Sequence, residues 1–66
     1  MANRLLKYFE HAHLPPHLQA VSQPCGDLAR EMDGKLPECA ETTAGLRKLL
    51  EAKDCFVRAA LDAAEE

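Results

Sequence analysis

The residues with the clearest potential for chemistry lie in the stretch 7–24, where aromatic rings and histidines flank a double proline. Tyr8 combines a flat ring with a polar hydroxyl, and nucleobases stack on such rings with about 1–3 kcal/mol per contact. Phe9 aligns with Leu5 and Leu6 at helical spacing, which favours a place in the core. Tyr8 is therefore the candidate ligand residue; the alternative is that both rings fill a core with few aromatic residues.

Lys53 is the second candidate, because it breaks the pattern of its own segment. On a helical wheel with Leu46 at the origin, Lys53 falls at about 340°, in the middle of an apolar arc. Two explanations stay open. In one, the stem of Lys53 packs while its ammonium reaches water or pairs with a carboxylate across an interface. In the other, subunit packing leaves a cavity there and the ammonium binds a phosphate.

The histidines and cysteines predict neither a metal site nor a catalytic centre. His11 and His13 do not share a helix face, prolines interrupt the spacing to His17, and no CxxC motif supplies further ligands. No local motif activates a cysteine, and the sequence contains no Walker loop, dinucleotide fingerprint or nucleophile elbow. We therefore expect a protein that is not an enzyme and that holds no metal or cofactor.

Helical segments alone are expected to position these residues, so the predicted fold class is all-α. Residues 3–12 form a short amphipathic helix that stops at the rigid Leu-Pro-Pro corner of residues 14–16. Residues 17–35 form the second helix. Its apolar positions are Leu18, Val21, Leu28 and Met32. Pro24 inside this helix predicts a kink, or a restart with Ser22 as the new N-cap.

Residues 41–63 form the longest predicted helix, and its apolar surface is wide. Charged residues occupy an arc from about 80° to 200°, and apolar residues cover the remaining arc of roughly 200°. That arc is about twice the stripe that a helix needs to pack on one neighbour. We therefore expect a single domain over residues 1–66, an antiparallel hairpin whose excess apolar surface packs against other copies in a compact homo-oligomer.

The charge distribution indicates a small anionic ligand rather than a nucleic acid. The net charge of −3 argues against a protein that coats duplex DNA. Residues 1–23 nevertheless carry two cations against one acid, and residues 47–58 carry four against two. No stretch is apolar enough for a membrane span or an export signal, and three cysteines suit a reducing cytoplasm.

Two stretches resemble a known family: KYFEHAHLPPHLQAVSQP, residues 7–24, and ETTAGLRKLLEAKDCFVRAAL, residues 41–61. They are similar to small phage proteins of the anti-CBASS cyclic-nucleotide sponges, whose helical hairpin is shared with the anti-Thoeris sponges. The resemblance implies a non-catalytic homo-oligomer, a hexamer in the best-known members, in the cytoplasm of the infected bacterial host. Such a protein sequesters cyclic di- or trinucleotide messengers in pockets between subunits.

The resemblance also implies roles for single residues. A tyrosine of the opening helix stacks on a base in this family, and Tyr8 matches it by position. The family's phosphate-binding lysine corresponds to Gln23 or its neighbours, so Lys53 or Arg47 is expected to hold the phosphates instead. Further ligand contacts are expected in the similar stretch HLPPHLQAVS, at His13, Leu14, Gln19 and Ser22.

Two other classes of function compete with the sponge. A small helical oligomer could act as an adaptor or inhibitor that binds a host protein through its apolar face. A nucleic-acid-binding regulator fits poorly, because the chain is acidic and has no basic recognition helix. Capture of an intact cyclic oligonucleotide distinguishes the sponge from both.

Overall fold

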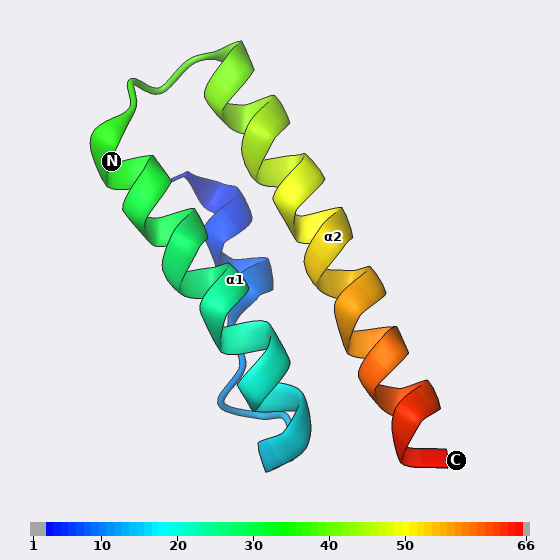
Figure 1. The fold of residues 1–66 in the computed structure, drawn as a ribbon. Helices are drawn as coiled ribbons and strands as arrows, with labels where there is room; N and C mark the ends of the chain where they lie inside the picture. The colour runs from blue at the N-terminus through cyan, green and yellow to red at the C-terminus, as the bar shows by residue number, and fades with distance from the viewer. Residues whose placement is uncertain (1–2, 66) are drawn as a thin grey trace.

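The computed structural model describes residues 3–65, with side chains described up to residue 63, and this part of the chain contains helices and no strand. A 3-10 helix, η1, covers Arg4–Phe9. Two α-helices follow, α1 over Pro16–Lys35 and α2 over Ala40–Glu65. The α-helices form an antiparallel hairpin, with η1 behind α1 in the view of Figure 1. The all-α fold class is confirmed.

The first helix is shorter and more tightly wound than the expected helix over residues 3–12. The Asn3 side chain accepts a hydrogen bond from the backbone N–H of Leu5 at 3.0 Å and donates one to Thr43 Oγ1 at 3.1 Å, which ties the start of η1 to α2. After Phe9 the backbone of Glu10 is extended. A segment this short gains little from α-helical hydrogen bonds, so its form follows from how its two ends are held.

The double proline that ends the first segment also starts α1. Pro15 is the N-cap and Pro16 the first helical residue, where the missing N–H of proline costs no hydrogen bond. Gln19 then closes the corner, because its Nε2 donates to the carbonyl oxygen of Leu14 at 2.6 Å. The predicted limits of both α-helices differ from the observed ones by at most two residues.

α1 continues through Pro24 without a break, so of the two expectations, a kink or a restart, the restart at Ser22 is wrong. Ser22 is fully buried within the helix and its Oγ has no hydrogen-bond partner, so it caps nothing. Pro24 cannot bond to the carbonyl oxygen of Ala20, but Pro24 and Ala20 are both exposed. Water can hydrate that carbonyl, and a helix of 20 residues tolerates the loss of one bond at its solvated surface.

The core is small and lies where η1 packs on the hairpin. Phe9, Ala29 and Leu46 are its buried hydrophobic residues. Gly26 allows the close approach, since a Cβ atom there would lie 3.1 Å from the carbonyl oxygen of Phe9. The buried face of α1 follows small residues and a single leucine, and the expected packing position Leu28 is exposed instead. The buried residues of α1 are Leu18, Ser22, Gly26 and Ala29.

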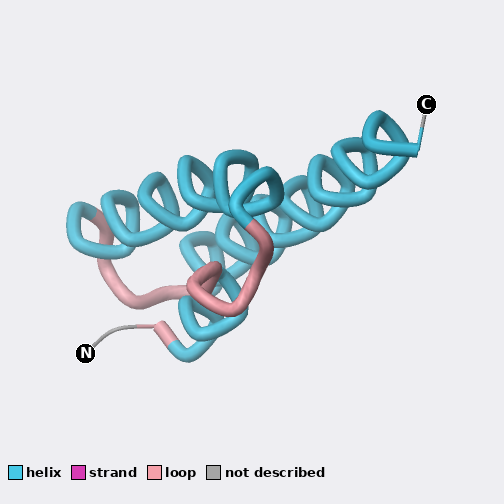
Figure 2. The backbone as a smooth tube through the Cα atoms, turned by 90° about the horizontal axis from the view of Figure 1, so that it is seen from below, coloured by secondary structure: helices cyan, strands magenta, loops and turns pink. Residues whose placement is uncertain are grey.

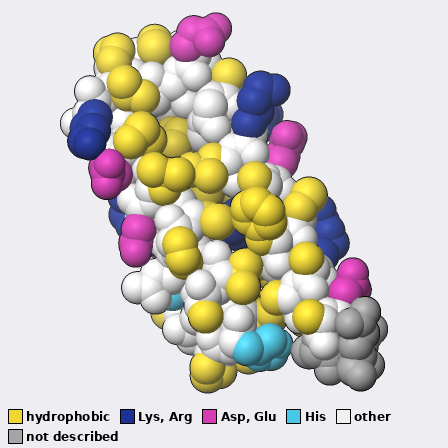
Figure 3. Space-filling model, in the orientation of Figure 1, with side chains coloured by type: hydrophobic (Ala, Val, Ile, Leu, Met, Phe, Trp, Pro, Cys, Tyr) yellow, Lys and Arg dark blue, Asp and Glu magenta, His cyan; other side chains and the backbone are white. Residues whose placement is uncertain are grey.

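The C-terminal part of α2 extends away from α1 in the view of Figure 2. No residue between 47 and 63 is fully buried, and Phe56 and Leu61 are 53 % and 43 % exposed. In Figure 3, hydrophobic side chains form a band over the face between the helices, with charged side chains mainly at its edges. This agrees with the expectation that one neighbouring helix does not cover the apolar arc of α2.

Candidate functional site

The candidate site lies where η1 meets α2, because this contact joins the two locally positive stretches of the sequence. Two neighbouring aromatic residues of η1 differ in their exposure. Phe9 points into the core and is fully buried, whereas Tyr8 is 53 % exposed. The expected division between a core ring and an accessible ring is therefore confirmed, and Tyr8 stands at the junction of the two elements.

One groove beside Tyr8 carries only positive charge, and we call it the cationic groove. It has a volume of about 390 Å³ and is lined by Arg4, Leu5, Lys7, Tyr8, Arg47 and Leu50. Within the described residues, none of its three cations forms an ion pair with a carboxylate. The ammonium of Lys7 lies 5.2 Å from the centre of the Tyr8 ring, a cation–π distance. The groove thus offers uncompensated positive charge next to an aromatic ring.

A second groove, which we call the mixed-charge groove, shares Lys7 and Tyr8 with the first and has a volume of about 380 Å³. The chain after Tyr8 contributes Glu10, His13 and Leu14. Its α2 wall consists of Lys53, Asp54, Val57 and Arg58. Both grooves fall in the size range of small-molecule sites. This groove brings together four residues expected from the sequence, namely Tyr8, His13, Leu14 and Lys53.

Lys53 is largely buried, with 14 % of its side chain exposed, and its ammonium is already paired. Nζ lies 2.7 Å from Asp54 Oδ1. Consecutive residues of a helix do not face each other, so the long Lys53 side chain bends along the groove to reach its neighbour. Within the chain, Lys53 therefore pairs with a carboxylate of its own helix, whereas the sequence led us to expect a carboxylate across an interface between subunits.

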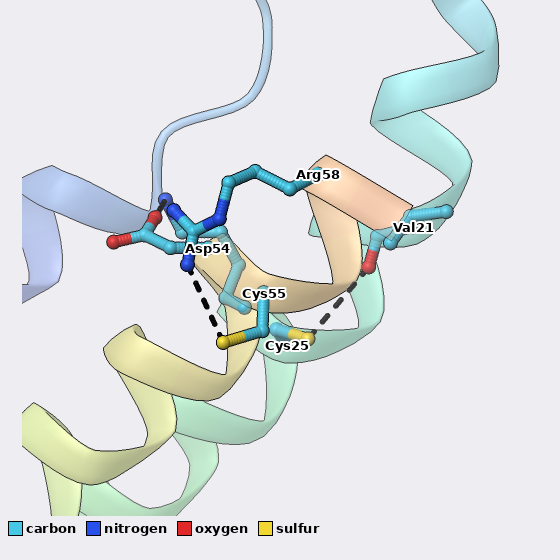
Figure 4. A network of polar contacts seen from close by, with 6 residues as sticks. Val21, Cys25, Asp54, Cys55 and Arg58 are labelled. Carbon is cyan, nitrogen blue, oxygen red and sulfur yellow. Dashed lines mark hydrogen bonds and ion pairs between the residues drawn. The ribbon is translucent and has the colours of Figure 1, made fainter. Parts of the chain in front are cut away.

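Arg58 lines the same groove as Asp54, and its side chain folds back along α2 in Figure 4. Arg58 Nη2 donates to Cys55 Sγ at 3.4 Å. On α1, Cys25 Sγ donates to the carbonyl oxygen of Val21 at 3.7 Å. The cysteine thiols of this region are thus occupied by local contacts within their own helices.

The remaining expected site residues lie apart from the mixed-charge groove. Arg47 lines the cationic groove, on which Tyr8 also borders. Gln19 lines neither groove; its Nε2 is held by the carbonyl oxygens of Leu14 and, at 3.5 Å, Ala12. Ser22 is fully buried. The structure therefore brings five of the seven expected residues around Tyr8, counting Tyr8 itself, and assigns Gln19 and Ser22 to the corner and to the core.

Three cations of the two grooves were not singled out from the sequence: Arg4, Lys7 and Arg58. They belong to the two stretches whose local positive charge was noted. What the sequence did not supply was the packing of η1 on α2, which places Arg4 and Lys7 beside Arg47. The clustering of positive charge in these two stretches was the signal in the sequence that pointed to these cations. The contact between η1 and α2 then brings them together in one site.

A separate polar group lies at the start of α2. Cys39 accepts the first helical hydrogen bond there, from Thr43 N to its carbonyl oxygen at 3.0 Å. Its exposed Sγ lies 3.4 Å from Thr42 Oγ1. Hydrogen bonding with the side chain and backbone of Thr42 lowers the pKa of the Cys39 thiol below its ordinary value.

The chain matches no family model, no curated protein and no solved structure. Within residues 3–65, no three His, Cys, Asp or Glu side chains gather so that they could hold a metal ion. None of the helices described is long and apolar enough to span a membrane. What the site can bind therefore has to be judged from the chemistry of its own residues.

Proposed function

We propose that this protein is a non-catalytic sponge of the anti-CBASS type, a phage protein that captures cyclic di- or trinucleotide messengers in the cytoplasm of the infected bacterial host. The observation that carries the proposal is the cationic groove, where three cations that form no ion pair within the described residues flank the exposed ring of Tyr8. A cyclic oligonucleotide bears a negative charge on each phosphate and presents flat bases. Cations and an aromatic ring in one groove match both features.

The charges of the groove suit a small anion better than a long one. Three cations from two elements can neutralise the phosphates of a cyclic dinucleotide, whereas the net charge of −3 opposes a long polyanion. Lys7 covers one face of the Tyr8 ring, so a base would stack on the other face. The cationic groove is lined by three cations, an aromatic ring and two leucines, which are groups suited to binding an anion with flat bases, and this supports sequestration.

Assembly into a homo-oligomer, a hexamer on the family resemblance, is the second part of the proposal. The apolar side chains of Phe56 and Leu61 lack cover within one chain, and an open groove on a single hairpin leaves a ligand in contact with water. Packing of copies would bury the apolar side chains and close the grooves. The native mass, measured by mass spectrometry or analytical ultracentrifugation, tests this part; a monomer would overturn it.

Capture and recovery of ligand test the sponge itself. The protein is mixed with a panel of cyclic di- and trinucleotides, removed, denatured by heat, and the supernatant is analysed by chromatography. Return of an intact ligand supports sequestration, and a degraded product would indicate an enzyme. No capture of any cyclic nucleotide would refute the sponge and favour the adaptor.

A matched pair of variants links capture to the cationic groove. Arg47→Gln removes a cation that lines this groove. Lys48→Gln removes the neighbouring exposed cation, which does not line the groove. Loss of a charge-assisted contact should weaken binding about tenfold in Arg47→Gln, measured by calorimetry. Lys48→Gln should bind as the wild type does. Equal effects of both substitutions would remove the assignment of phosphates to this groove.

The adaptor is the second candidate, and a specific observation favours it. An apolar groove of about 260 Å³ between the end of α1 and the start of α2 is lined largely by hydrophobic side chains, among them Met32, Leu36, Leu46 and Leu49. A hydrophobic residue of a partner protein could enter such a groove. The adaptor predicts binding to a host protein that is insensitive to Arg47→Gln.

A further inference from the structure

The two grooves beside Tyr8 differ in one respect that bears on which base is bound. The cationic groove contains no carboxylate, whereas the mixed-charge groove contains Glu10 and Asp54. A phosphate is attracted to the first groove and repelled by the carboxylates of the second. If a nucleotide occupies both grooves around Tyr8, its phosphate lies in the cationic groove and its base in the mixed-charge groove.

The two carboxylates of the mixed-charge groove are not equivalent. Asp54 is paired with Lys53, with Nζ 2.7 Å from Oδ1. Glu10 makes no side-chain hydrogen bond or ion pair within the described residues, and it is exposed. Glu10 follows Tyr8 by two residues and lines the same groove, so its carboxylate is available to a base stacked on Tyr8.

We infer that Glu10 makes the mixed-charge groove selective for guanine. An ionised carboxylate only accepts hydrogen bonds, and its two oxygens can accept a pair of parallel ones. Guanine is the base whose Watson–Crick edge presents two adjacent donors, N1–H and the N2 amino group. Adenine, cytosine and uracil place an acceptor next to each donor on that edge, and such an acceptor is repelled by a carboxylate.

This inference rests on the proposed capture of cyclic nucleotides and adds the identity of the base. In this inference Glu10 recognises the base, and the cationic groove binds the phosphates. Asp54 pairs with Lys53 and compensates the charge of its ammonium. Base selectivity should therefore change when Glu10 loses its charge, and overall affinity should change when Arg47 does.

The test compares two ligands with the same ring and the same phosphates, cyclic di-GMP and cyclic di-AMP, by calorimetry on the intact protein. The wild type should bind cyclic di-GMP about tenfold more tightly or better, the discrimination expected of a good bidentate contact to a base. Glu10→Gln should bring the ratio of the two affinities close to one, mainly by weakening cyclic di-GMP. Glu38→Gln is the matched control, because Glu38 is an exposed carboxylate that lines neither groove, and it should keep the wild-type ratio.

Each outcome has a defined reading. Equal affinities in the wild type, tighter binding of cyclic di-AMP, or a ratio that Glu10→Gln leaves unchanged would overturn guanine selection while the proposed sponge stands. Failure of both ligands to bind the wild type would overturn the guanine selection, and the wider nucleotide panel would then decide the fate of the sponge. The wild-type ratio needs no variant, so the inference stays testable even if Glu10→Gln were unstable.

Discussion

Substitution of Gly26 by alanine should show that the candidate site depends on the close approach of η1 to α1. A Cβ atom at position 26 would lie 3.1 Å from the carbonyl oxygen of Phe9 and 3.4 Å from Phe9 Cβ. It would also lie 3.1 Å from Arg30 Nη2, but that group ends a flexible side chain and can move away. The Phe9 carbonyl is backbone, so relief of this contact requires η1 to shift.

The expected magnitude follows from two opposing effects. Alanine favours a helix over glycine by about 0.5–1 kcal/mol. Overpacking of a well-packed contact costs about 1–3 kcal/mol. The net effect at Gly26 should be a loss of about 1 kcal/mol in the free energy of unfolding, or a fall of about 4–8 °C in Tm for a domain of this size.

Gly34→Ala is the control, because it lies in the same helix and a Cβ atom there meets nothing within 4 Å. This variant should be more stable than the wild type by about 0.5–1 kcal/mol. Thermal and urea unfolding, followed by circular dichroism at matched protein concentration, measures both variants. If Gly26→Ala raised the stability as Gly34→Ala does, the tight contact between η1 and α1 would be refuted. In the expected case, calorimetry should also show weaker ligand binding in Gly26→Ala, because η1 carries Tyr8.

Three further changes test other parts of the molecule. Asp54→Asn should tighten the binding of pyrophosphate or a cyclic dinucleotide a few-fold, because it frees the ammonium of Lys53 and removes a repelling carboxylate; unchanged or weaker binding in calorimetry would contradict this. Phe56→Glu should shift sedimentation toward smaller species while helicity measured by circular dichroism stays intact, because Phe56 is exposed and outside the core; an unchanged sedimentation coefficient would exclude this face as an interface. Thr42→Val should move the pH midpoint of Cys39 alkylation upward and slow the reaction at neutral pH, because hydrogen bonding with Thr42 is the main cause of the lowered pKa of Cys39. Thr42→Ser keeps the hydroxyl and should preserve the wild-type pH midpoint. Equal pH profiles in all three proteins would refute Thr42 as the cause.

The helices of this protein could be predicted from its sequence because their signals are local. The double proline sets the start of α1, and the long stretch without proline sets α2. The form of η1 could not be predicted, because the hydrogen bond from Asn3 to Thr43 on α2 and the burial of Phe9 decide it. The continuity of α1 through Pro24 also depends on exposure, which a sequence pattern does not reveal.

The candidate site was predictable only in part, because some of its features are local in the sequence and others depend on tertiary contacts. Tyr8 stood out by its chemistry, and its exposure beside the buried Phe9 follows from the direction of neighbouring side chains. Lys53 stood out by its place on the helical wheel, but its partner Asp54 is the next residue, a pairing that helical geometry disfavours. Long side chains can bend to contacts that a wheel does not represent.

The position of the cationic groove has a consequence for the stability of the element that carries it. Arg4 and Lys7 on η1 lie beside Arg47 on α2 with no carboxylate among them, so their mutual repulsion opposes the docking of η1. An anion in the groove would replace that repulsion by attraction to both elements, and its binding free energy would add to the stability of the docked state. A ligand with phosphate groups would thus help to hold η1 in place, whereas the core contact of Phe9 and the hydrogen bonds of Asn3 hold it there in the free protein.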